Sequence, residues 1–148
     1  MRYYEDVEIG VVQKFGSYEV TREEVLDFAR RYDPQVFHLD DEAAAKTHFG
    51  RISASGWHTA AMTMRMLVDN MNATQEKGLG SPGVEKLRWM KPVYPGDTLR
   101  CESETLKKRI SDTRPNMGIS QGSVTVFNQN NEPVMIFEST LLIEVRGD

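Results

Sequence analysis

A stretch of nearly uncharged sequence at residues 55–71 limits the folds open to this chain more than any other feature. It reads SGWHTAAMTMRMLVDNM, and Arg65 is its first basic or acidic side chain apart from one histidine. The N-terminal half is therefore apolar or small on nearly every side, and a helix of that kind is usually buried all round. We expect the rest of the chain to form a layer that wraps around this helix.

The second half of the chain has the composition of β-strands. Residues 83–109, 118–130 and 132–145 are β-rich runs, separated by Pro-Gly-Asp and Asn-Asn turns. Residues 11–20 form one more β-prone run before the helices. Because successive strands joined by short turns make an antiparallel sheet, the sequence predicts an α+β fold, with an antiparallel β-sheet wrapped around one long central α-helix. A chain of 148 residues fits a single domain, residues 1–148.

Composition and charge argue against several classes of protein. The formal net charge of -4 disfavours a nucleic-acid or anionic-membrane partner. Cys101 is the only cysteine, so no disulfide forms within the chain and a reducing cytoplasm is expected. The N-terminus carries acids where a signal peptide needs an apolar core, and no apolar run is long enough to cross a bilayer. The histidines lack ligand spacing with cysteines or carboxylates, so no metal site is expected.

Asp33 and His38 stand where a predicted helix breaks. The helix opens at Thr21, which has capping-box spacing with Glu24, and Pro34 ends it by pushing the preceding residue out of helical geometry. On a continuous helix, side chains five residues apart point ~140° away from each other. Off the helix, the carboxylate and the imidazole can turn toward one point and polarise a water between them, which is general acid–base chemistry. The alternative is that Asp33 only terminates the helix and His38 makes one ordinary hydrogen bond.

A second candidate site lies at the start of the apolar helix, in the sequence SASGW at residues 53–57. Unpaired backbone N–H groups at a buried helix N-terminus bind an anion or a developing oxyanion. Gly56 has no side chain to keep a ligand carbonyl away from that backbone. The alternative is that Ser55 is an ordinary N-cap and that the glycine serves helix–sheet packing. An acid–base pair on one loop and a backbone oxyanion site on another would suit chemistry at an activated carbonyl.

Three motifs, YDPQVFHLDDEAA, GRISASGWHTAAM and KPVYPGDTL, resemble the MaoC-like acyl dehydratases of the hotdog superfamily, which include the (R)-specific enoyl-CoA hydratases. The resemblance implies a hotdog fold, a homodimer or dimer of dimers, and an active site near the subunit interface that takes a trans-2-enoyl-CoA. It implies no cofactor beyond the coenzyme A thioester that is the substrate. Asp33 and His38 match the family's catalytic pair, and Gly56 matches the glycine whose N–H binds the thioester oxygen.

The chain departs from the family pattern at several positions. The hydratase motif commonly reads Asp-x-Asn-Pro-x-His, and Gln35 and Val36 occupy the Asn and Pro positions here. Ser55 stands where a histidine often precedes the helix glycine, and Ala61 stands where characterised hydratases carry a serine. The catalytic pair and the helix glycine remain. The resemblance therefore implies hydration or dehydration of an enoyl-CoA or 3-hydroxyacyl-CoA thioester, with the acyl chain left open.

Three residues are predicted to bind the substrate. Ser55 and Trp57 flank the glycine of the oxyanion site. Arg114 lies in the basic turn at residues 107–118, from which a cation could meet the phosphates of coenzyme A. The alternatives are a solvated hairpin end for Arg114 and a core or interface position for Trp57, as for Trp89.

Two other functions are compatible with the same scaffold. An acyl-CoA thioesterase would also use an acid near a helix N-terminus, and a non-catalytic protein could bind an acyl thioester without reacting with it. The loop with the aspartate and the histidine before the helix argues against the thioesterase, whereas the departures at Gln35, Val36 and Ala61 keep the binding protein open. The resemblance implies a hydro-lyase of fatty acid metabolism.

Overall fold

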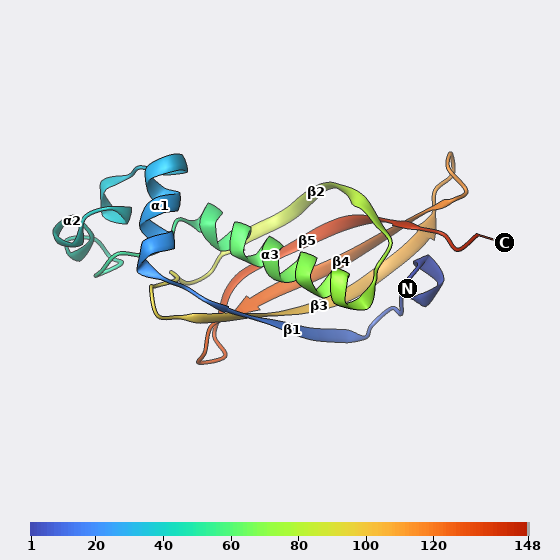
Figure 1. Ribbon diagram of the computed structural model, residues 1–148, viewed down its shortest axis with the longest axis horizontal. Helices are drawn as coiled ribbons and strands as arrows, with labels where there is room; N and C mark the ends of the chain where they lie inside the picture. The colour runs from blue at the N-terminus through green and yellow to red at the C-terminus, as the bar shows by residue number, and fades with distance from the viewer. Residues whose placement is uncertain (148) are drawn as a thin grey trace.

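The computed structural model describes residues 1–147, in which one long helix lies along a sheet and a short helical segment extends beyond the end of that sheet (Figure 1). The strands are β1 (Val12–Glu19), β2 (Gly78–Trp89), β3 (Thr98–Ile110), β4 (Met117–Phe127) and β5 (Pro133–Glu144). The helices are α1 (Arg22–Tyr32), α2 (Asp41–Ala45) and α3 (Gly56–Thr74), with 3-10 turns η1 (Tyr4–Asp6) and η2 (Val36–His38).

The sheet has the strand order β1-β3-β4-β5-β2, and every neighbouring pair is antiparallel. β3, β4 and β5 follow one another as hairpins, which is the arrangement that their short connecting turns predict. β2 does not form a hairpin with β3. It lies at the far edge of the sheet beside β5, where Val84 pairs with Ser139. The sheet is antiparallel as predicted, and the edge position of β2 is the one feature of the strand order that short connecting turns do not explain.

The connection between β2 and β3 explains this order. It crosses the end of the sheet beside the start of α3 and returns next to the end of β1. The Ala54 N–H donates to the Val93 carbonyl over 2.8 Å, and the Gly96 N–H donates to the Val20 carbonyl over 2.8 Å. The Val20 N–H in turn donates to the Asp97 carbonyl over 2.8 Å. These bonds satisfy backbone groups in a buried crossing and place β3 next to β1.

Local sequence signals account for the start of α1. The Thr21 Oγ1 accepts from the Glu24 N–H over 3.2 Å, so Thr21 is the N-cap. The reciprocal half of the predicted capping box does not form, because the Glu24 carboxylate accepts instead from the Tyr18 hydroxyl over 2.6 Å. Val20 and Val25, which have the spacing of a hydrophobic staple, are both buried in the core.

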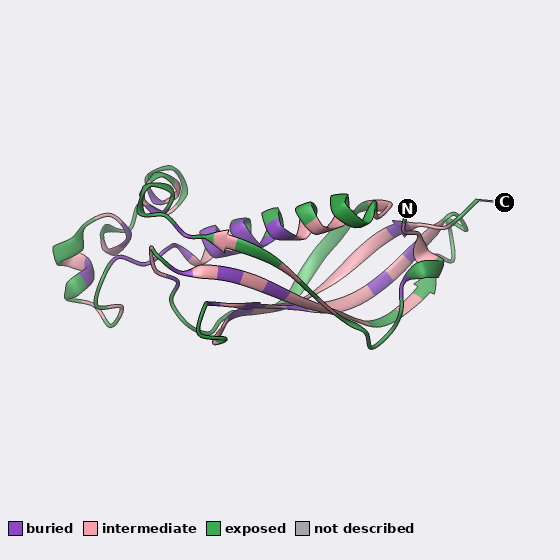
Figure 2. Ribbon diagram, turned by 60° about the horizontal axis from the view of Figure 1, so that its bottom comes forward, coloured by how far each residue is buried: buried purple, intermediate pink, exposed green. Residues whose placement is uncertain are grey.

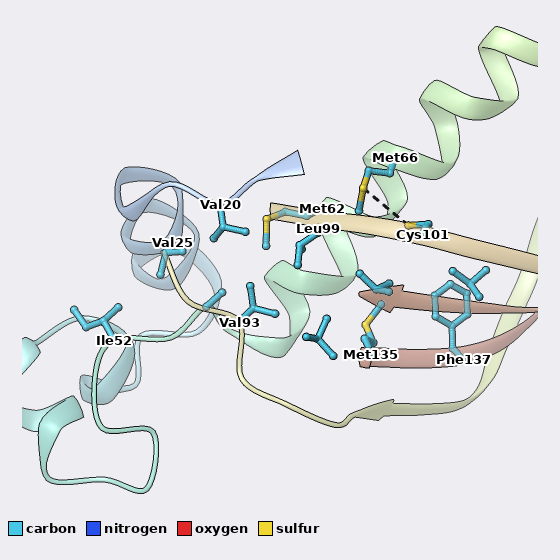
Figure 3. Close-up of a cluster of buried hydrophobic side chains, with 14 of the residues drawn as sticks. Val20, Val25, Ile52, Met62, Met66, Val93, Leu99, Cys101, Met135 and Phe137 are labelled. Atoms are coloured by element: carbon cyan, nitrogen blue, oxygen red, sulfur yellow. Dashed lines mark hydrogen bonds between the residues drawn. The ribbon is translucent and has the colours of Figure 1, made fainter. Parts of the chain in front are cut away.

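The hydrophobic core lies between the first half of α3 and the sheet (Figure 3). Met62 and Met66 of α3 share one buried cluster with Leu99 and Cys101 of β3 and Met135 of β5. Full burial of a side chain of this size is worth ~1.5–3 kcal/mol. The cluster therefore fixes the N-terminal half of α3, and with it the start of the helix, against the sheet.

One side of α3 stays open to solvent. Trp57 is 62% exposed, Met64 53% and Val68 40%. They recur at seven- and four-residue intervals and so form one stripe along the helix. Figure 2 shows that the buried residues of α3 gather in its first turns. The prediction of burial on every side was wrong, because the sheet covers only one side of the helix.

A cavity of about 710 Å³ lies between the second half of α3 and the sheet. Small residues of β3, β4 and β5 line it on the sheet side, among them Ser103, Ser120, Gly122 and Ser139. Because these residues are shorter than the core residues farther along the same strands, the space beneath the helix is not filled. None of the residues proposed from sequence for the site lines this cavity.

None of the helices described within residues 1–147 has the length and apolar character needed to span a bilayer.

Candidate active site

The loop that follows α1 brings Asp33 and His38 together. Asp33 is the C-cap of α1, with φ -148° and ψ 68°, so the backbone leaves helical geometry at the residue before Pro34. His38 ends the 3-10 turn η2. The Asp33 Oδ2 lies 3.4 Å from the His38 Nε2. The two side chains therefore turn toward one point, as the break at Pro34 predicts.

His38 is held in one orientation by the backbone. Its side chain is 6% exposed, and its Nδ1 lies 2.7 Å from the carbonyl oxygen of Ser53. A carbonyl oxygen can only accept, so Nδ1 carries a proton. In the neutral imidazole, Nε2 is then an unprotonated acceptor that faces the carboxylate of Asp33. Two acceptors at this distance are compatible with a proton shared between them or with a water in contact with both.

Asp33 is held as the carboxylate. Burial raises its pKa, but the Ser55 hydroxyl, the Gln35 amide and the electrostatic contribution of His38 together outweigh burial and hold the pKa below its ordinary value. The Gln35 Nε2 donates to the Asp33 Oδ1 over 2.7 Å. The nearby Ser55 hydroxyl also lowers the pKa of Asp33, although it makes no hydrogen bond of good geometry among residues 1–147. At neutral pH the Asp33 side chain is thus ready to accept a proton.

The start of α3 carries polar groups without protein partners. Ser55 has the N-cap position, yet its hydroxyl makes no cap hydrogen bond, so the interpretation of Ser55 as an ordinary N-cap was wrong. The hydroxyl oxygens of Ser53 and Ser55 are both buried without a hydrogen-bond partner among residues 1–147. The N–H groups of Gly56 and Trp57 also have no acceptor within that range. These two N–H groups are the donors that a helix start offers to a ligand oxygen.

Gly56 also meets a packing requirement. A Cβ at this position would lie 2.5 Å from a ring atom of Trp89, at the end of β2. The packing interpretation of this glycine was therefore correct, with Trp89 as the neighbour. It does not compete with the oxyanion interpretation, because the side-chain position and the N–H are different parts of the same residue.

The remaining predicted residues divide between the two ends of the molecule. Trp57 meets Trp89 edge-on, with ring centroids 5.0 Å apart, and its exposed fraction of 62% excludes the core position considered for it. Arg114 is exposed in the turn between β3 and β4, and Figure 1 shows that turn at the end of the sheet opposite to α1 and α2. The structure does not bring Arg114 to Asp33 within one chain.

His58 does not belong to the acid–base pair. It is 5% exposed, and its ring stacks on Phe28 of α1 with centroids 4.8 Å apart. Burial lowers its pKa, and Glu24 opposes that shift. His58 is therefore a packed histidine between α1 and α3. No group of three histidine, cysteine, aspartate or glutamate side chains within residues 1–147 could hold a metal ion.

Sequence reasoning missed three contributions to this site. Gln35 was noted only as a departure from a motif, although an amide two residues after an aspartate is within reach of its carboxylate. The Ser53 carbonyl that orients His38 has no sequence signal, because any residue carries a carbonyl. Trp89 was treated as core or interface filler, and its contact with Gly56 joins residues far apart in the chain.

Known proteins with the same architecture identify the family. Residues 6–126 match the family described as MaoC like domain. The uncharacterized protein YdeM of Bacillus subtilis is 31% identical over 93% of this chain and 94% of YdeM. The crystal structure of the MaoC-like dehydratase from Rhodospirillum rubrum is 34% identical, with a TM-score of 0.88 over 100% of both chains. The R-hydratase PhaJ1 from Pseudomonas aeruginosa is 25% identical, with a TM-score of 0.69 over 99% of this chain and 91% of PhaJ1.

The antiparallel sheet around α3 is the hotdog fold that the sequence motifs imply. The family match covers the loop with Asp33 and His38, the start of α3 and the crossing into β3. The chain belongs to the MaoC-like dehydratase family.

Proposed function

We propose that the protein catalyses the reversible hydration of a trans-2-enoyl-CoA to an (R)-3-hydroxyacyl-CoA, a reaction of fatty acid metabolism. The observation that carries the proposal is the 3.4 Å approach of the Asp33 Oδ2 to the His38 Nε2. The site lies beside a helix start whose N–H groups are free to bind an oxygen. The similarity to the R-hydratase PhaJ1 supports the same class of reaction.

The acid–base pair is suited to hold the reacting water. Both the His38 Nε2 and the Asp33 Oδ2 accept hydrogen bonds, and their separation of 3.4 Å exceeds the ~2.7–2.9 Å of a direct charge-assisted bond. A water in contact with both atoms would donate one hydrogen bond to each. Its oxygen lone pair would then be free to attack carbon.

In the hydration direction, the water oxygen bonds to C3 while Asp33, assisted by His38, accepts the proton of the water. The electron pair of the C2–C3 double bond shifts toward the thioester oxygen and gives an enolate. The proton then passes through the pair, and His38 delivers it to C2 as the thioester carbonyl re-forms. One water is added across the double bond, and both side chains return to their starting protonation states.

The enolate oxygen would bind the Gly56 N–H. Loss of one donor of this kind typically costs ~2.7–4 kcal/mol of transition-state stabilisation. Every step uses side chains, a backbone N–H and water, so we propose that the reaction needs no cofactor beyond the coenzyme A carried by the substrate.

A single assay tests this function. The purified protein is incubated with crotonyl-CoA and with longer enoyl-CoAs while the absorbance of the conjugated thioester and the release of free thiol are both recorded. The proposal predicts loss of the conjugated absorbance without thiol release. Thiol release would instead indicate a thioesterase, and no change in either signal would indicate a protein that binds acyl thioesters without reaction.

We also propose that the protein works as a homodimer, joined through the open side of α3 and the edge strand β2. Trp57, Met64 and Val68 expose a stripe of apolar surface on α3, and Val84 of β2 is 52% exposed. Contiguous exposed apolar surface and an unpaired strand edge are both features of interaction surfaces. Within such a dimer, Arg114 could meet the phosphates of a substrate bound at the other subunit.

Light scattering during size-exclusion chromatography tests the dimer. The wild-type protein should elute with twice the mass of one chain, or a multiple of it, and Val84→Asp should shift it toward the monomer. Leu106→Asp is the matched control, because Leu106 of β3 is 46% exposed and does not lie on this surface. A monomeric wild-type protein would rule out the proposed interface.

A further inference from the structure

Gln35 contacts both members of the acid–base pair through different parts of one residue. Its side-chain Nε2 donates to the Asp33 Oδ1 over 2.7 Å. Its backbone carbonyl accepts from the His38 N–H over 2.9 Å and so caps the 3-10 turn that carries the imidazole. Among residues 1–147, Gln35 is the residue whose side chain donates a hydrogen bond of good geometry to the Asp33 carboxylate.

These contacts fix the orientation of the Asp33 carboxylate relative to His38. The terminal torsion of an aspartate is broad, so a carboxylate without partners rotates readily. With Oδ1 held by the amide of Gln35, Oδ2 is the oxygen that remains for His38, and it lies 3.4 Å from Nε2. An amide N–H also favours the charged form of a carboxylate over the neutral acid.

We propose that Gln35 is a positioning residue of the hydratase site: its amide holds the ionised Asp33 carboxylate so that Oδ2 faces His38 and the reacting water. This inference rests on the proposed function and deepens it, because it assigns a role to the residue that replaces the asparagine of the family motif. Gln35 itself does not touch the substrate. Its neighbour Val36, at the motif's proline position, is 61% exposed and makes no side-chain hydrogen bond.

The variants Gln35→Met and Gln35→Glu test the role of the amide. Methionine keeps the length of the side chain and removes the donor, while glutamate places a second carboxylate beside Asp33. Both changes make the ionised form of Asp33 less favourable, so the acidic limb of the kcat/KM profile should move to higher pH, farther for glutamate. At neutral pH, Gln35→Met should lower kcat/KM about tenfold, the effect of losing one hydrogen bond to a charged group.

Val36→Ala is the matched control, with kcat/KM within twofold of wild type and an unmoved acidic limb. A fall in activity for Gln35→Met without movement of the limb would contradict the proposal, as would activity within twofold of wild type. Thermal unfolding separates these effects from a folding defect, and none is expected because Gln35 is exposed.

A second readout does not depend on catalysis. Carbon-13 NMR titration of the Asp33 carboxyl should give a higher pKa in Gln35→Met than in the wild-type protein, because a hydrogen bond that stabilises the charge is lost. An unchanged titration would overturn the inference. If the titration moves but the wild-type protein hydrates no enoyl-CoA, the positioning role stands and the proposed function fails.

Discussion

The Asp33 Oδ2 lies 3.4 Å from the His38 Nε2, although an unbroken helix would turn the two side chains ~140° apart. Pro34 ends α1 between them, and the turn η2 brings the imidazole back toward the carboxylate. The same loop therefore provides both the interruption of the helix and the geometry of the pair. The carbonyl of Ser53, three residues before the start of α3, fixes the imidazole from the other side.

Gly56→Ala should displace Trp89, because the added Cβ would lie 2.5 Å from the indole. Overpacking of this kind typically costs ~1–3 kcal/mol of stability. Trp57 and Trp89 are the only two tryptophans of the chain, and their rings meet edge-on, so tryptophan fluorescence reports on this part of the protein. We expect a shifted emission maximum, a lower melting temperature and slower hydration.

The control for this change is Gly83→Ala in β2, where an added Cβ would meet no atom of residues 1–147 within 4 Å. It should leave fluorescence and activity unchanged. An unaltered emission spectrum in Gly56→Ala would show that Trp89 does not rest against this glycine in solution.

His58 should make the protein less stable as the pH falls. Burial holds its pKa below the ordinary value of 6.5, and Glu24 only partly opposes this. Between the pKa of His58 in the folded protein and its pKa in the unfolded chain, the unfolded chain binds more protons. The free energy of unfolding therefore rises with pH up to about 6.5, and this contribution to stability disappears as the pH falls through the folded-state pKa. Urea unfolding between pH 5 and pH 7.5 should show a weaker pH dependence for His58→Gln than for wild type.

His48→Gln is the comparison for that experiment, because His48 is exposed. It should follow the pH dependence of the wild-type protein. Equal slopes for His58→Gln and wild type would mean that His58 is not held in its neutral form.

Cys101 should resist thiol reagents in the folded protein. It is fully buried beside Met66, and burial raises the pKa of its thiol to about 12. The thiolate is the reactive form, so the native protein should show no labelling at pH 8 and one equivalent after denaturation. Rapid native labelling would contradict the packing of β3 against α3 and would add a background to the thiol-release assay.

Local signals were enough to predict much of the fold. Thr21 and the valines on either side of it mark the start of α1, Pro34 marks its end, and the turns after β3 and β4 predict two hairpins. The position of β2 could not be predicted, because pairing with β5 depends on contacts between distant parts of the chain. Residues 90–97, which cross the sheet end, read as an ordinary turn in the sequence.

The same division applies to the candidate site. The spacing of Asp33, Pro34 and His38 predicts that the two side chains can converge, because it depends only on local backbone geometry. The sequence could not show that the Ser55 hydroxyl makes no N-cap hydrogen bond and lies near Asp33. The position of this hydroxyl depends on how α1 packs beside α3. Arg114 was assigned from charge alone, and charge does not reveal at which end of the sheet a turn lies.

The central claim is that Asp33 is the catalytic base, and the rate at which the Asp33→Asn variant hydrates crotonyl-CoA tests it most directly. The variant keeps the size of the side chain and removes the base, so turnover should fall about a hundredfold or more while the melting temperature stays close to that of the wild type. Asp27→Asn is the control, because Asp27 is exposed on α1 and, among residues 1–147, its side chain forms only a surface ion pair with Arg31. Turnover by Asp33→Asn equal to that of the wild type and of Asp27→Asn would contradict the assignment of Asp33 as the catalytic base.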